Sequence, residues 1–128
     1  MKIDIHDGLA FVSGSLIYRG KQLELQHVVV DTGSIGSVFS SDKLGSVGFV
    51  ATSEDIVRQV RGGGVEYVVV RQIDHLTIGE LEVENFEIEV GAMDYGFQVE
   101  GIVGLDFLLK TGAIIDLARL EMRKDVQA

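Results

Sequence analysis

The chain has 128 residues, a formal net charge of −9, and neither cysteine nor proline. This length suits one domain, which we expect to span residues 1–128. The lack of cysteine excludes a disulfide framework and a thiol nucleophile. The acidic balance argues against a phosphate-backbone partner, so we expect no nucleic-acid binding. The acidity is most simply a solubility feature, and a negative cleft for cationic substrates is the alternative.

The chain carries no targeting or membrane signal that we can identify. Its first residues include Lys2 and Asp4, where a signal peptide would need an apolar run. The longest apolar stretches, such as 28–30, are far too short to span a bilayer. We therefore expect a cytoplasmic location and no membrane partner.

The hydrophobic pattern predicts an all-β fold with one short helix. Strands are predicted over 9–18, 22–30, 35–40, 55–60, 65–72, 75–78, 81–90, 99–103, 113–117 and 120–123, and the helix over 105–110. Apolar and polar residues alternate in the first part of 22–30, which is typical of a strand with one buried face. The region 41–52 is predicted as a loop with one helical turn. Short strands at spacings of roughly 8–12 residues indicate a barrel or a sandwich.

The most informative segment is VVVDTGSIGSVFS, residues 28–40. It places the carboxylate of Asp31 at the end of a buried strand, on a tight turn. Gly33 lets the backbone bend and lets another group approach closely. Thr32 and Ser34 supply hydroxyl groups that can donate hydrogen bonds to the carboxylate. An ordinary Asx-type turn is the alternative interpretation, because these residue types are common in turns.

Three features, in their order along the chain, resemble the retropepsin-like aspartic proteases. They are the DTGS motif at 31–34 after an apolar run, the three glycines at 62–64 between two predicted strands, and the segment GIVGLDFL at 101–108. The segment 112–116 also resembles the closing segment of that family. The likeness covers roughly residues 9–123. It implies a closed β-barrel of the acid-protease type with one short C-terminal helix.

The resemblance also implies a role for each residue of the DTGS motif. Asp31 would be the catalytic residue. Thr32 would hydrogen-bond across a dimer axis and fix two such loops together. Gly33 would let water or substrate approach, and Ser34 would bond the outer oxygen of the carboxylate.

Two further segments have implied roles. The residues that would support the catalytic loop from behind are Ile102, Val103 and Gly104. The residues that would form the tip of a mobile flap over the substrate are Gly62, Gly63 and Gly64, for which a passive flexible loop is the alternative. Retroviral members of the family usually carry Arg where this chain has Leu105, so the pattern is closer to cellular and bacterial relatives.

The chemistry implied by this family needs two carboxylates around one water, yet the chain has one Asp-Thr-Gly motif. The simplest solution is a symmetric homodimer that brings Asp31 and its counterpart together. We therefore expect an aspartic endopeptidase that acts on a peptide or protein substrate, with no metal and no cofactor. The alternative is a catalytically inactive module of the same fold that binds peptides or mediates dimerisation.

The other titratable residues give less support for a metal site or for a second catalytic acid than the DTGS motif gives for an aspartic protease. His6, His27 and His75 are widely spaced and lack the pairing typical of a metal site. Asp106 follows Gly104 closely and could be catalytic by position. A role in starting the short helix, or in bonding the nearby loop, is the more economical interpretation of Asp106.

Overall fold

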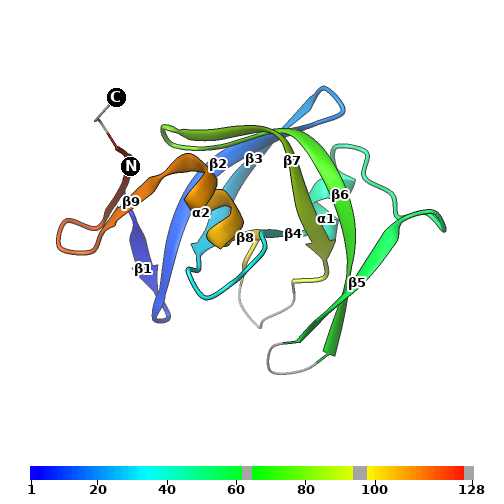
Figure 1. Cartoon of the computed structure of the whole chain (residues 1–128), viewed down its shortest axis with the longest axis horizontal. Helices are drawn as coiled ribbons and strands as arrows, with labels where there is room; N and C mark the ends of the chain where they lie inside the picture. The colour runs from blue at the N-terminus through cyan, green and yellow to red at the C-terminus, as the bar shows by residue number, and fades with distance from the viewer. Residues whose placement is uncertain (62–64, 94–97, 126–128) are drawn as a thin grey trace.

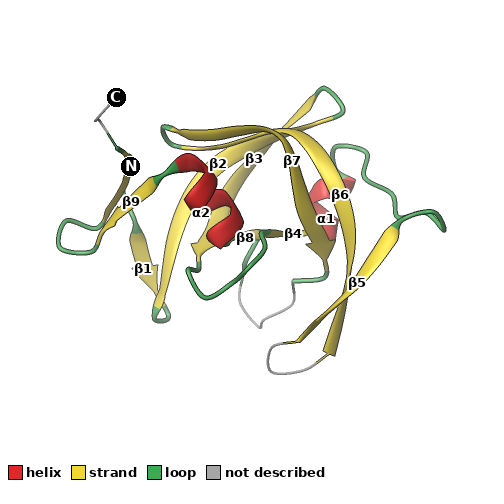
Figure 2. Cartoon of the chain, viewed as in Figure 1, coloured by secondary structure: helices red, strands yellow, loops and turns green. Residues whose placement is uncertain are grey.

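The computed structural model describes residues 1–61, 65–93 and 98–125, and most of these residues lie in β-strands (Figures 1 and 2). The strands are β1 Asp4–His6, β2 Leu9–Tyr18, β3 Lys21–Val30, β4 Val38–Ser40, β5 Ile56–Arg61, β6 Val65–Ile78, β7 Leu81–Gly91, β8 Gly101–Val103, β9 Ala113–Asp116 and β10 Glu121–Lys124. The helices are α1 Ser41–Gly45 and α2 Leu105–Thr111. Within the described residues, neither helix has the length and apolar character needed to cross a membrane.

A closed barrel is the centre of the fold. The main sheet runs in the order β1-β2-β3-β8-β4-β7-β6-β5, and an additional pairing joins β2 to β6. That pairing closes β2, β3, β8, β4, β7 and β6 into a six-stranded ring. The all-β closed barrel expected from the sequence is therefore confirmed. The expected short helix is α2, which packs on β7, β8 and β9.

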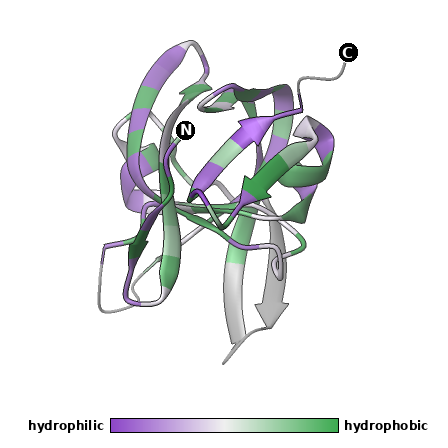
Figure 3. Cartoon of the chain, turned by 90° about the vertical axis from the view of Figure 1, so that its left-hand side faces the viewer, coloured by the Kyte–Doolittle hydropathy of each residue, from purple (hydrophilic) through white to green (hydrophobic). Residues whose placement is uncertain are grey.

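The barrel interior is apolar because the strands alternate buried and exposed residues. Figure 3 shows this alternation as bands of opposite hydropathy along the strands. On β3, Leu25 is buried whereas Gln26 is exposed. The side chains that fill the centre include Leu16, Leu25, Phe39, Leu76, Ile88 and Phe107. Burial of these side chains is the main favourable term in the stability of the fold.

The strand β6 differs from its prediction. The sequence predicted two strands, 65–72 and 75–78, whereas the structure has one strand of 14 residues, Val65–Ile78. The alternation continues through the expected break, because Ile73 is buried and Asp74 is exposed. Ile73 also pairs with Phe86 of β7, so the ladder is not interrupted.

The region 41–52 begins with α1, which is the helical turn expected there. The Ser40 side chain caps this helix by accepting a hydrogen bond from the Lys43 amide at 3.3 Å. The preceding strand is shorter than predicted, since β4 covers Val38–Ser40 and not 35–40. Strand β1 was not predicted, and it pairs with the start of β2.

The β5–β6 hairpin was predicted from the sequence. Its strands pair from Ile56 opposite Val70 to Arg61 opposite Val65. Strand β5 lies at the edge of the sheet, and Figure 1 shows the hairpin projecting from the barrel. The residues predicted as its tip, Gly62 to Gly64, lie outside the described part of the chain.

Gly14 allows the barrel to close. β2 pairs with β3 and also with β6, and its register with β3 shifts between Val12 and Gly14. A Cβ atom at Gly14 would lie 2.2 Å from the carbonyl oxygen of Thr77 on β6. Only glycine leaves room for the β6 backbone at this point.

A partly buried arginine, Arg71, joins β6 to the loop that follows α1. The Nη2 atom of Arg71 lies 2.6 Å from the Oδ1 atom of Asp55, in an ion pair whose side chains are 13% and 10% exposed. Arg71 also donates hydrogen bonds to the Tyr18 hydroxyl and to the Val50 carbonyl. Its guanidinium lies 4.7 Å from the centre of the Phe49 ring. This one side chain therefore orders the base of the β5–β6 hairpin.

The first prediction concerns barrel closure. Gly14→Ala is expected to lower the free energy of unfolding by about 1–3 kcal/mol, because the added methyl must displace the Thr77 backbone. Gly45→Ala is the matched control, since a Cβ atom at Gly45 in α1 would meet nothing within 4 Å. The control should match the wild type or gain about 0.4–1 kcal/mol. Urea unfolding followed by circular dichroism measures both, and equal midpoints would contradict the role of Gly14.

A second prediction concerns stability in acid. Hydrogen bonds from the Thr52 amide and from Arg71 hold the pKa of Asp55 below its usual value. The stability that this lowered pKa contributes is complete above the unfolded pKa of about 3.9 and is lost as the pH falls through the lower, folded pKa. Asp55→Asn should therefore be less stable than the wild type at pH 6, and the difference should shrink below about pH 4. A difference in urea midpoint that stays constant with pH would contradict this account.

Candidate active site

Asp31 stands where β3 leaves the barrel. Residues 28–30 of β3 pair in parallel with 101–103 of β8, which lies between β3 and β4. The Asp31 amide continues this pairing by donating a hydrogen bond to the Val103 carbonyl at 3.0 Å. The chain then turns, and the Ser34 amide donates to the Asp31 carbonyl at 3.2 Å. The Asp31 backbone is therefore held on both sides, at the end of a strand with buried neighbours.

The Asp31 carboxylate is partly exposed and is oriented from within its own turn. Its Oδ1 atom accepts a hydrogen bond from the Gly33 amide at 2.9 Å. A Cβ atom at Gly33 would lie 3.2 Å from the same oxygen, so a side chain there would crowd the carboxylate. Among the described residues, no group donates a hydrogen bond to Oδ2. One carboxylate oxygen is thus fixed, and the other is available to a reactant.

The two hydroxyl groups of the motif are placed differently from each other. The Ser34 hydroxyl donates its proton to the Gly36 carbonyl at 2.7 Å, so in this chain it cannot also donate to Asp31. The hydrogen bond from the Ser34 hydroxyl to the outer carboxylate oxygen, which the family resemblance implies, is therefore not made within the described part of this chain. Thr32 is exposed and has no hydrogen-bond partner in the described part of the chain. Its bond across a dimer axis stays a prediction.

The segment at 102–104 lies directly behind this loop. The Gly104 amide donates to the Ser37 hydroxyl at 3.0 Å, and the Leu105 amide donates to the Ser34 carbonyl at 2.8 Å. A Cβ atom at Gly104 would lie 2.5 Å from the Ser34 and Gly36 carbonyl oxygens. Glycine is therefore required here for a close approach of two backbones. The side chain of Ile102 packs beside Val29 in a small apolar cluster under the loop.

Asp106 bonds the loop that follows Asp31. Its Oδ1 atom accepts from the Ser37 hydroxyl at 2.7 Å and its Oδ2 atom accepts from the Ser37 amide at 3.1 Å. The Phe107 amide also donates to Oδ1, at 2.8 Å, and the Asp106 amide donates to the Ile35 carbonyl at 3.2 Å. The loop-bonding interpretation of Asp106 is therefore confirmed. Sequence reasoning did not single out Ser37, whose side chain is 1% exposed and links α2 to the loop.

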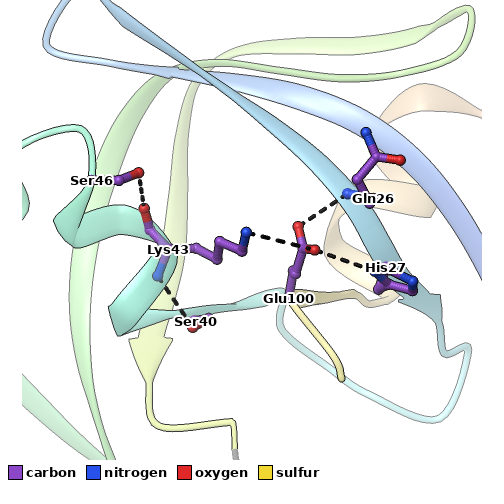
Figure 4. A network of polar contacts seen from close by, with 6 residues as sticks. All are labelled: Gln26, His27, Ser40, Lys43, Ser46 and Glu100. Atoms are coloured by element: carbon purple, nitrogen blue, oxygen red, sulfur yellow. Dashed lines mark hydrogen bonds and ion pairs between the residues drawn. The ribbon is translucent and has the colours of Figure 1, made fainter. Parts of the chain in front are cut away.

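The buried carboxylate of Glu100 fixes the start of β8 (Figure 4). The Glu100 side chain is 3% exposed, and its Oε1 atom accepts from the Gln26 amide at 3.0 Å. Its Oε2 atom lies 3.3 Å from His27 Nδ1 and 3.8 Å from Lys43 Nζ. The Ser40 amide donates to the Glu100 carbonyl at 2.9 Å. Glu100 thereby links β8 to β3 and to α1. No local sequence pattern predicted this role.

The remaining polar features lie away from Asp31. His27 contacts Glu100, whereas His75 lies 3.4 Å from Glu82. Within the described ranges, no group of three or more His, Asp or Glu residues is placed to hold a metal ion. A surface cavity of about 420 Å³ is lined by residues that include Arg71 and Asp55, beside the arginine network. Asp31 is not among the residues that line this cavity.

The Asp106 contacts lead to a third prediction. Asp106→Ala is expected to lower the free energy of unfolding by about 1–3 kcal/mol, because it leaves the buried polar groups of Ser37 without an acceptor. Asp106→Asn keeps one acceptor oxygen and should cost less. Asp74→Ala removes an exposed bond to the Gly20 amide and serves as the control, with an effect within about 0.5 kcal/mol. The midpoints of urea unfolding rank the three variants by stability. Equal decreases in the free energy of unfolding for Asp106→Ala and Asp74→Ala would contradict this role of Asp106.

Comparison with known proteins places this geometry in a family. A family model described as aspartyl protease matches residues 17–107, which is more than half of the chain. One similar solved structure is a retropepsin-like aspartic protease from Rickettsia conorii, with 18% sequence identity and a TM-score of 0.64 over 90% of this chain and 82% of that chain. A search of curated proteins finds no match. The structural likeness shows a retropepsin-like fold, and the family match spans the Asp31 loop and the segment behind it, so the chain belongs to the aspartyl protease family.

Proposed function

We propose that the protein is an aspartic endopeptidase that hydrolyses peptide bonds as a homodimer, with one Asp31 from each protomer. The observation that carries this proposal is the state of the Asp31 carboxylate. One of its oxygens accepts the Gly33 amide at 2.9 Å, and the other has no donor among the described residues. A carboxylate that is oriented yet open on one side can receive the proton of a bound water.

A second carboxylate is needed, and the chain carries one Asp-Thr-Gly motif. Asp106 contacts the loop that follows Asp31, and its two oxygens accept hydrogen bonds from Ser37 and Phe107. Both oxygens of Asp106 thus already accept hydrogen bonds, two of which come from the loop. A two-fold axis next to Asp31 supplies the missing group as a second Asp31, in the same orientation relative to its own loop.

The reaction then follows from one proton shared by two carboxylates. Like charges at short range disfavour double ionisation, so the pair holds one proton and titrates as a unit. The ionised carboxylate takes a proton from water as the water oxygen adds to the peptide carbonyl carbon. The protonated carboxyl donates a hydrogen bond to the carbonyl oxygen. The carbon–nitrogen bond breaks when the amide nitrogen receives a proton from the pair.

The β5–β6 hairpin suits the recognition of an extended peptide. β5 is the edge strand of the main sheet, so its outer backbone groups can pair with an added strand. Backbone pairing of this kind binds peptides with little dependence on their sequence. Side-chain contacts then set the preference for particular peptide sequences.

The fourth prediction tests the catalytic role of Asp31. Asp31→Asn is expected to lower kcat/KM on a peptide library by at least about a hundredfold, because the amide cannot act as a general base. Wild-type activity should follow a bell-shaped pH profile, which falls when the pair is doubly protonated or doubly ionised. Cleavage rates are measured across pH by mass spectrometry of the peptides.

The control is Asp74→Asn, which alters an exposed acid in the middle of β6 and should keep full activity. Equal cleavage by the wild type and Asp31→Asn would contradict the proposal. Peptide binding without cleavage by the wild type would also overturn it, and would favour a non-catalytic module of the same fold.

A further inference from the structure

A buried carboxylate, that of Glu89 on β7, lies against the loop that follows Asp31. Glu89 is 8% exposed, and its amide donates a hydrogen bond to the Ser37 carbonyl at 2.9 Å. A Cβ atom at Gly36 would lie 2.7 Å from the Oε1 atom of Glu89. The absence of a side chain at Gly36 therefore leaves the space that this carboxylate occupies, beside the loop.

The side chain of Glu89 is on the face of the sheet that is turned away from the main core. Successive residues of a strand point to opposite faces, and the neighbours Ile88 and Val90 both belong to the main core. Val38 on the adjacent strand β4 is placed in the same way, because its neighbour Phe39 is a core residue. Glu89 and Val38 therefore share the outer face, where they pair across the two strands.

A row of paired residues on this face leads from the Asp31 strand to Glu89. The Asp31 amide continues the pairing of β3 with β8, so Val29 and Asp31, two residues apart, lie on one face. Val29 pairs with Ile102 of β8, and the two share an apolar cluster separate from the main core. Ile102 also pairs with Val38, which pairs in turn with Glu89. The face that carries Asp31 is thus apolar at β8 and β4 and acidic at β7.

We infer that Glu89 gives the enzyme a preference for peptides with a lysine or an arginine near the cleaved bond, an inference that rests on the proposed function. Neighbouring strands are about 4.8 Å apart, so Glu89 is about 10 Å from Ile102 along the row. An extended peptide rises about 3.3 Å per residue, so this distance corresponds to about three residues. The basic residue is therefore within about three residues of the cleaved bond. Each protomer of the proposed homodimer carries one Glu89, so the preference applies on both sides of that bond.

The chemistry of this position suits a cationic side chain. Lysine and arginine donate charge-assisted hydrogen bonds to a carboxylate, and such bonds are stronger where water is largely excluded. Glu89 also takes part in an interaction within the chain. A carboxylate has about four acceptor positions, so it can accept from a substrate as well as from the chain. The net charge of −9 attracts any cationic peptide, whereas Glu89 recognises the position of the cation within it.

The fifth prediction concerns this preference. Peptides that the wild type cleaves are resynthesised with Lys, Gln or Glu at each position within three residues of the cleaved bond. At one such position kcat/KM should be about tenfold or more higher for Lys than for Gln, and lowest for Glu. Glu89→Gln, which has nearly the same shape, should bring the Lys-to-Gln ratio to about one. Glu84→Gln is the matched control, since it makes the same change on β7 at a side chain that is 78% exposed, and it should keep the wild-type ratio.

The ratio separates recognition from structural support. A wild type that cleaves Lys and Gln peptides equally at every position would overturn the inference and leave the proposed function intact. Equal decreases for both peptides in Glu89→Gln would also overturn it, because they indicate a structural role alone. Circular dichroism checks that the variant folds. Where it does not, Glu89→Asp, which withdraws the carboxylate by one methylene, takes its place, and a ratio equal to that of the wild type would overturn the inference.

A wild type that cleaves no peptide would contradict the proposed function, and binding then decides the inference separately. Dissociation constants of Lys and Gln peptides are measured by fluorescence anisotropy for the wild type and Glu89→Gln. Tighter binding of the Lys peptide that Glu89→Gln removes would support recognition by Glu89. Equal binding of the two peptides by the wild type would overturn it.

Discussion

The backbone bond between Asp31 and Val103 is the constraint on which the site depends. It exists because β8 is inserted between β3 and β4, parallel to one strand and antiparallel to the other. This insertion brings a segment that begins 70 residues after Asp31 to the end of β3. The turn at 31–34 is therefore not a free loop, because its backbone is held from behind by β8 and by the start of α2.

Two hydrogen-bonded carboxylates secure that insertion from opposite ends, the partly buried Asp106 and the buried Glu100. Asp106 joins α2 to Ser37 beyond the end of β8, and Glu100 joins the start of β8 to β3 and to α1. A buried charge is costly unless it is hydrogen-bonded, and both of these carboxylates have several donors. Each of them specifies one arrangement of the strands around Asp31. The polar groups that support the loop are hydrogen-bonded, whereas the Asp31 carboxylate has one oxygen without a donor among the described residues.

A rigid half-site has a consequence for assembly. The chain orients one carboxylate and uses the neighbouring Asp106 for structure, so a second copy completes the chemistry in our proposal. The backbone of α2 is bonded to the loop that carries Asp31, so the helix and the loop form one unit within the chain.

The sequence by itself determined the barrel class, most of the strand positions and the place of Asp31, because these depend on local patterns. The hydrophobic pattern located β2 at Leu9–Tyr18 to the residue, and the DTGS motif marked the turn at the end of β3. Sequence did not determine the continuity of β6 through Asp74, the burial of Glu100, or the bond between Ser37 and Asp106. Those features depend on partners that are distant along the chain, 69 residues apart for Ser37 and Asp106. Only the tertiary structure decides which distant groups meet, because burial and hydrogen-bond pairing are properties of the packed chain and not of a local pattern.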